Sequence, residues 1–176
     1  MYPELHQAPS TTNPWRALPA CATDTDADPA PARPLLACAT GSVLRGTEGA
    51  CRLDALQPGA ALVSRSGAVV HLRRTETLHI SRLDLHRCPQ LAPIRFDPGT
   101  LPGQVGDLAV LLSPDCPVFT APDPNSALGG AFPAAAFCNG ATVRHVIPDE
   151  GIDYVRICLS EPAEICIGGL WVRMQG

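Results

Sequence analysis

The chain has 176 residues, of which 45% are hydrophobic, and this is enough for one globular domain with a buried core. Its net charge is −4 and its 13 basic residues, all arginines, form no basic stripe, so we expect no nucleic-acid partner. No apolar run approaches the roughly 20 residues that a membrane helix needs, and the N-terminus lacks the basic and apolar regions of a signal peptide. We therefore expect no membrane insertion and leave the location open between the cytoplasm and export by a signal-peptide-independent route. The exclusive use of arginine and the abundance of alanine and of proline, with 19 residues, indicate a GC-rich, bacterial genome.

Residues 1–34 are the first segment that the sequence sets apart. Here the run TDTDADPAPARP alternates Pro, Asp and Ala with almost no bulky apolar side chain, so burial cannot offset the entropy of ordering. We predict a flexible N-terminal tail over residues 1–34, followed by one domain over residues 35–176.

From Leu35 onward, short apolar stretches alternate with turn-forming residues. In chain order they are LLACAT, SVLRG, CRLDAL, AALVS, AVVHLRR, ETLHISRLDL, APIRF, DLAVLLS, PVFTA, ATVRHVI, YVRICLS and EICIGGLWVRM. No stretch keeps a helical period for three turns between breakers, although short helical turns are expected at residues 52–56 and 133–137. The pattern predicts an all-β domain of about a dozen short strands.

Eight cysteines raise the question of disulfides or a metal site. The chain is neither very small nor visibly secreted, so we expect reduced thiols. A zinc site would need paired Cys-x-x-Cys or Cys/His clusters, and His86-Arg87-Cys88 is the nearest approach. We expect no cofactor, but a cysteine-rich metal or redox binder stays open if Cys88, Cys116 and Cys138 converge.

Two blocks of sequence resemble a known family. Residues 38–64 contain, in order, a cysteine, a Gly-Ser pair, an apolar strand, a glycine turn and a Leu-x-x-Gly element. Residues 92–119 lead through an apolar strand into the Ser-Pro break of LLSPDCPVF, and FPAAAFCNGATVRHV follows. In this order the motifs resemble bacterial hedgehog/intein (Hint) domains over most of residues 36–174. The resemblance implies a compact β fold with a pseudo-twofold arrangement.

The resemblance also implies a chemistry. In a self-processing Hint domain the first cysteine attacks the preceding carbonyl and converts an amide into a thioester, which requires a reactive sulfur, an oxyanion donor and an acid. By position, Cys38 is the nucleophile, the bond from Ala37 to Cys38 is the target, and Thr40 or nearby backbone amides serve the oxyanion. We expect Cys116 to approach Cys38 in the interior, within bonding reach if their Cα atoms lie within about 7 Å.

The acid is where this sequence departs from the family. The family places histidine two residues after Ser-Pro, where this chain has Cys116, and further histidines where it has Arg156 and Pro162. Neither arginine nor proline can give a proton near neutral pH. Strict alternation places His145 with Val143 and Ile147 on an apolar face, where a packed core histidine is the commoner case and a replacement acid beside Cys38 is the alternative. His79 is expected at the surface.

Three functions follow from these expectations. The first is a degenerate Hint-type domain that no longer processes itself and acts as a structural or interaction module for an unknown protein partner or fused domain. The second is an autoprocessing domain that performs an N-to-S acyl shift and cleaves between Ala37 and Cys38, so that any enzymatic activity would be self-cleavage through Cys38. The third is the cysteine-rich binder.

Overall fold

The computed structural model describes residues 35–101, 104, 107–120 and 130–176, which belong to one compact unit, Pro34–Gly176. The tail predicted over residues 1–34 lies outside the described residues, so the proposed division at residue 34 stays a prediction.

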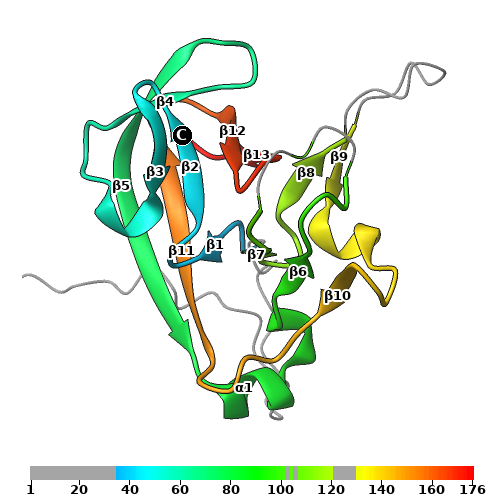
Figure 1. The fold of residues 1–176 in the computed structure, drawn as a ribbon. Helices are drawn as coiled ribbons and strands as arrows, with labels where there is room; N and C mark the ends of the chain where they lie inside the picture. The colour runs from blue at the N-terminus through cyan, green and yellow to red at the C-terminus, as the bar shows by residue number, and fades with distance from the viewer. Residues whose placement is uncertain (1–34, 102–103, 105–106, 121–129) are drawn as a thin grey trace, which may run out of the picture. The chain divides into compact units, whose positions relative to one another are not determined.

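The unit is built from a single antiparallel sheet of 13 strands (Figure 1). The strands are β1 (Cys38–Ala39), β2 (Val43–Gly46), β3 (Gly49–Arg52), β4 (Ala61–Val63), β5 (Val69–Ile80), β6 (Ile94–Phe96), β7 (Val110–Leu112), β8 (Pro117–Phe119), β9 (Ala131–Pro133), β10 (Val143–His145), β11 (Ile152–Leu159), β12 (Ala163–Ile167) and β13 (Leu170–Met174). Their order is β10-β6-β7-β1-β11-β5-β4-β2-β12-β13-β8-β9, with β3 paired to β2. The prediction of an all-β domain of about a dozen strands is confirmed.

Helix is confined to short pieces. The 3₁₀ helices η1 (Leu53–Ala55) and η3 (Ala134–Phe137) lie where helical turns were expected, and η2 (Pro89–Leu91) adds another. Helix α1 (Arg82–Arg87) was not expected, because ETLHISRLDL looked like one apolar stretch. The Ser81 hydroxyl accepts a hydrogen bond from the Asp84 amide and caps α1, so β5 ends at Ile80. Within the described residues no helix is long and apolar enough to span a membrane.

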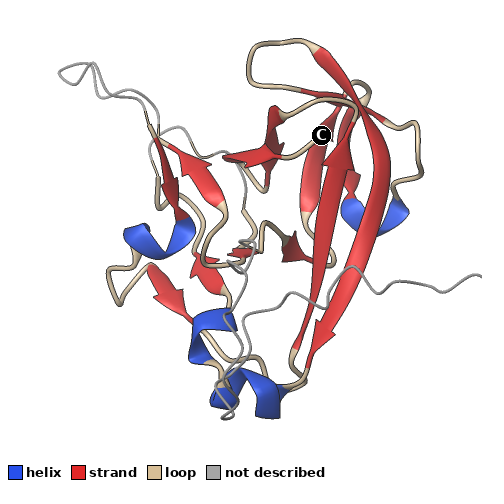
Figure 2. Ribbon diagram, turned by 180° about the vertical axis from the view of Figure 1, so that it is seen from behind, coloured by secondary structure: helices blue, strands red, loops and turns tan. Residues whose placement is uncertain are grey.

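The sheet curls around one interior. Strands β9 and β10 stand at opposite ends of the strand order, yet only η3 and a short turn connect them in the chain. Figure 2 shows the same arrangement from behind, with the long β5 and β11 pair on one side of the unit. A curled sheet buries its inner face without a second layer, which explains how such short strands form a core.

Tyr154 on β11 connects the sheet to the segment that follows β5. Its side chain is fully buried, and its hydroxyl donates a 2.9 Å hydrogen bond to the carbonyl of Leu91 in η2. Burial raises the pKa of this phenol, and the nearby Cys116 thiol adds to the shift. Tyr154 therefore ties the α1–η2 segment to β11 as a neutral donor.

Asp97 resolves a like-charge conflict between two strands. Arg95 on β6 and Arg144 on β10 are directly opposite in the ladder, an arrangement that by itself is destabilising. Asp97 accepts a 2.7 Å hydrogen bond from each guanidinium. The Arg95 and Arg144 hydrogen bonds lower the pKa of the Asp97 carboxyl below its ordinary 3.8.

We expect this carboxylate to make stability depend on acid. A carboxyl whose pKa is lower in the folded state than in the unfolded state stabilises the fold at any pH above its unfolded-state pKa. This contribution is lost as the pH falls through the folded-state pKa. The difference in unfolding free energy between the wild type and Asp97→Asn should be constant near neutrality and shrink below pH 3.8. Urea unfolding over a pH series measures it, and Asp107→Asn, which removes a carboxylate that forms no ion pair within the described part of the chain, is the control. A difference that stays constant down to the lowest pH would contradict this prediction.

Candidate functional site

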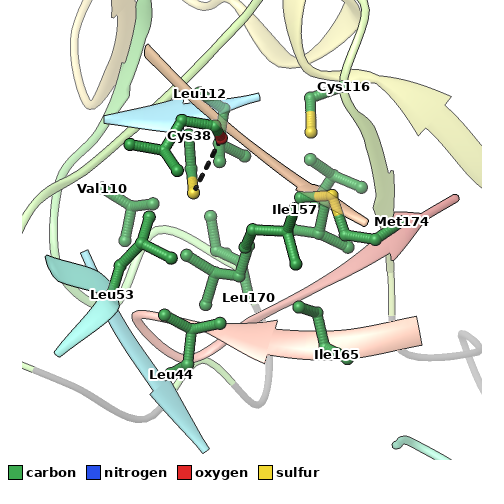
Figure 3. Close-up of a cluster of buried hydrophobic side chains, with 14 of the residues drawn as sticks. Cys38, Leu44, Leu53, Val110, Leu112, Cys116, Ile157, Ile165, Leu170 and Met174 are labelled. Atoms are coloured by element: carbon green, nitrogen blue, oxygen red, sulfur yellow. Dashed lines mark hydrogen bonds between the residues drawn. The ribbon is translucent and has the colours of Figure 1, made fainter. Parts of the chain in front are cut away.

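Cys38 begins β1 and lies in the middle of the sheet. Its register partners are Val155 on β11 and Leu112 on β7, and its side chain is fully buried. The thiol is 3.9 Å from the Val155 carbonyl oxygen, to which it donates, as the dashed line in Figure 3 shows. The sulfur therefore faces the hydrophobic interior instead of solvent.

Ser113 forms hydrogen bonds with both the amide and the carbonyl of Ala37, the residue before Cys38. The Ala37 amide donates to the Ser113 hydroxyl at 3.0 Å, and the Ser113 amide donates to the Ala37 carbonyl at 2.9 Å. The same hydroxyl donates to the Leu35 carbonyl, and its side chain is fully buried. A backbone donor therefore already lies on the carbonyl that the Cys38 sulfur would attack. From the sequence, Ser113 was expected only as part of a strand break, although a serine before proline at a strand end is a visible signal.

Cys116 completes a tight turn that starts at Ser113. Its amide donates to the Ser113 carbonyl at 3.0 Å, and its side chain is fully buried. The Cys116 sulfur is near enough to the Ser113 hydroxyl and the Ala37 amide for both to act on its pKa. Cys38 and Cys116 belong to one buried cluster, shown in Figure 3, and both are free thiols.

The electrostatics of this cluster oppose ionisation. Burial raises the pKa of the Cys38 thiol from 9.0 to about 12, with hydrogen bonds from Ser42 and its own amide partly opposing the shift. At pH 7 about one molecule in 10⁵ would then carry the thiolate. Burial also raises the pKa of Cys116 well above 9.0, and the neighbouring Cys38 adds to it. Neither sulfur is suited to act as a nucleophile or a proton donor near neutral pH.

Thr40 is at the exposed end of β1. Its hydroxyl and its amide both donate to the Asp153 carbonyl, at 3.1 Å and 2.9 Å. In this conformation both donors are therefore occupied away from the Ala37 carbonyl.

His145 is exposed at the end of β10, although Val143 on the same face is buried. The expectation of an apolar environment for His145 is wrong, because β10 is an end strand and pairs only with β6 among the described strands. In the strand order it is three strands from β1, roughly 14 Å along the sheet.

Arg156 and Pro162, which were expected where the family has histidines, do not point toward Cys38. Arg156 follows Val155, the partner of Cys38, so it points to the opposite face, where it lies 3.7 Å from Glu76. Pro162 is exposed between β11 and β12. The four histidines of the described residues are all exposed: His71, His79, His86 and His145. His79 pairs with Asp153 at 2.6 Å on the surface, where it was expected.

A groove of about 250 Å³ runs past the exposed end of β1. Residues that line it include Thr40, Ser42 and Arg52, but not Cys38 or Cys116. An external thiol in this groove would therefore need the sheet to open before it could reach the interior.

No metal-binding group of three or more His, Cys, Asp or Glu side chains is formed by the residues that the structure describes. Cys88, Cys116 and Cys138 accordingly do not converge. The expectation of reduced thiols is wrong at Cys88, which is disulfide-bonded. The free cysteines are Cys38, Cys51, Cys116, Cys138, Cys158 and Cys166.

A single curled antiparallel sheet of short strands with little helix is the architecture of a Hint-type domain. The chain matches the family model described as Hint domain over residues 36–173, and it belongs to this family. No curated protein matches it in sequence.

Solved structures that share the fold include an intein-like domain and an intein. The bacterial intein-like domain from Clostridium thermocellum, solved in solution, is similar with a TM-score of 0.54 and 9% identity, over 81% of this chain and 99% of that one. The crystal structure of the MchDnaB-1 intein is similar with a TM-score of 0.50 and 9% identity, over 78% of this chain and 99% of that one. At these identities the likeness establishes the fold alone.

Proposed function

We propose that this protein is a degenerate Hint-type domain that does not process itself efficiently and acts as a structural or interaction module for a fused domain or a protein partner. The observation that carries the proposal is the state of the site. Its sulfur is a fully buried neutral thiol, and Cys116 stands where the family has histidine.

An N-to-S acyl shift needs three groups, of which this site supplies one. The Ser113 amide is a donor on the Ala37 carbonyl. A thiolate is disfavoured by burial, and every described histidine is exposed whereas Cys38 is fully buried, so none is placed to protonate the departing amine. General acid catalysis is typically worth 10²–10⁴-fold, so its loss alone would leave little reaction.

The segment before Cys38 also supports a scaffold role. Leu35 and Ala37 are buried, and Ser113 binds the backbone of both. These residues behave as part of the sheet and not as a leaving segment. A segment bound in this way favours a domain that stays joined to whatever precedes it over one that releases it.

Autoprocessing with cleavage between Ala37 and Cys38 is the second candidate. It is favoured by the retained nucleophile and by the donor on the target carbonyl. For this activity the site would have to open, so that solvent reaches the Cys38 sulfur and a proton donor reaches the Cys38 amide nitrogen.

We expect added thiol to leave the chain whole. Freshly expressed protein incubated with and without dithiothreitol at pH 7 and pH 9 should give one intact mass throughout. Cys38→Ala should give the same mass pattern and lower the free energy of unfolding by about 1 kcal/mol through lost packing. If thiol instead releases a fragment that begins at Cys38, and Cys38→Ala abolishes it, the autoprocessing candidate replaces our proposal. Such cleavage should rise about tenfold per pH unit, because the thiolate population limits it.

A further inference from the structure

Two free cysteines are buried together in the hydrophobic interior. Among the six free cysteines of the described residues, only Cys38 and Cys116 are fully buried. Both belong to the same hydrophobic cluster, and Figure 3 shows both side chains within it. Cys38 adds to the raised pKa of the Cys116 thiol, as expected of two thiols in one buried cluster.

The backbone explains why the two residues meet. Cys38 is directly opposite Leu112, and the next pair in that ladder is held by the hydrogen bond from the Ser113 amide to the Ala37 carbonyl. From Ser113 the chain makes one tight turn to Cys116, closed by the hydrogen bond between their backbones. Turns of this kind keep their end Cα atoms within about 7 Å. Cys116 is therefore one turn away from Ser113, which pairs with Ala37, the neighbour of Cys38 in the chain.

We propose that Cys38 and Cys116 form a dithiol site that closes into a disulfide when the chain meets a disulfide oxidant. The bond would use the sulfur that our proposed function leaves idle, and in that respect the inference rests on that function. Closure would tie the start of β1 to the turn after β7 at the place where the family has its nucleophile and its histidine.

The chemistry needs a disulfide co-reactant such as oxidised glutathione. One cysteine, as thiolate, attacks a glutathione sulfur, which breaks the glutathione disulfide, forms a mixed disulfide and releases one glutathione thiolate. The second cysteine thiolate then attacks the protein sulfur of the mixed disulfide and releases the second glutathione. The two protons lost by the cysteines are taken up by the two glutathione thiolates. The protein dithiol is oxidised by two electrons, and the glutathione disulfide is reduced by two.

Burial sets the rate of this reaction. A thiol with a pKa of about 12 in a closed interior reacts slowly, and oxidation requires the sheet to open at β1. Oxidation should therefore accelerate as pH rises from 7 to 9. Once formed, the bond closes a long loop of the unfolded chain, so the melting temperature should rise by several degrees.

A peptide map of the native chain tests the pair. After incubation with oxidised glutathione, the remaining thiols are alkylated in acid. The chain is then cleaved on the N-terminal side of Asp and on the C-terminal side of Arg, except where proline follows the arginine. Residues 28–45 then carry Cys38 alone, residues 115–122 carry Cys116 alone, and residues 123–144 carry Cys138 alone. We expect a disulfide-linked product of the first two peptides that dithiothreitol separates, together with glutathione on the exposed Cys138.

Variants separate this result from other outcomes. Cys116→Ser should abolish the linked peptide, whereas Cys138→Ser should leave it unchanged. If Cys138 reacts fully and no linked peptide forms in the native chain, or if it forms only in urea, the inference is overturned. This readout does not depend on Cys116→Ser folding, because the wild type carries it. A fragment that begins at Cys38 would refute the proposed function and would be seen separately from the linked peptide.

Discussion

Replacing Ser113 by alanine should lower the free energy of unfolding by about 2–4 kcal/mol, because two buried backbone groups lose their partner at once. These groups are the Ala37 amide and the Leu35 carbonyl, which both bind the Ser113 hydroxyl. Ser113 is fully buried, so water cannot take the place of the hydroxyl. Urea unfolding followed by circular dichroism measures the change.

Ser42→Ala is the matched control. Its hydroxyl also donates to a backbone carbonyl, that of Ala39 at 2.7 Å, but at a half-buried position where water can replace it. We expect a loss of less than about 1 kcal/mol there. Ser113→Thr keeps the hydroxyl and should recover part of the stability. Equal losses for Ser113→Ala and Ser42→Ala would show that Ser113 is not the clamp on the segment before Cys38.

Gly151→Ala should be at least as damaging as the loss of Ser113. Gly151 precedes β11 with a φ of +82°, and a Cβ atom there would lie 2.3 Å from the Ile80 carbonyl oxygen. Because the obstacle is backbone at the end of β5, no flexible side chain can move aside. We expect a loss of about 2–4 kcal/mol from the left-handed backbone and the overlap together.

Gly67→Ala isolates the backbone part of this effect. Gly67 has a φ of +86°, but a Cβ there meets nothing within 4 Å. We expect Gly67→Ala to lower the free energy of unfolding by only about 1 kcal/mol in the same urea measurement. If the two variants were equally destabilised, the close approach between Gly151 and the end of β5 would not exist in solution.

The order of turn formers and apolar runs was enough to predict the all-β class, because short strands need a chain reversal at each end. The same local pattern located the helical turns that became η1 and η3. It failed at ETLHISRLDL, where the cap that starts α1 depends on one serine hydroxyl. Ser81 followed three residues later by Asp84 is a helix-capping pattern that divides this stretch.

The candidate site was only partly accessible from sequence. Motif order indicated Cys38 and Cys116, since both stand at recognisable strand ends. His145 was misplaced because alternation says which residues share a face, but not whether another layer covers that face. Ser113 was missed because its importance comes from two backbone groups at residues 35 and 37, about 76 positions earlier in the chain.

By itself the sequence determined the family and the fold class, because these depend on residue types and their order. Only the tertiary structure decided the chemical state of the site. The pKa of Cys38 follows from complete burial between β7 and β11, and burial depends on strands that are distant in the chain. The donor on the Ala37 carbonyl likewise exists only because β1 pairs with the end of β7. Desolvation and cross-strand hydrogen bonds are properties of assembled neighbours, and no local pattern of letters specifies them.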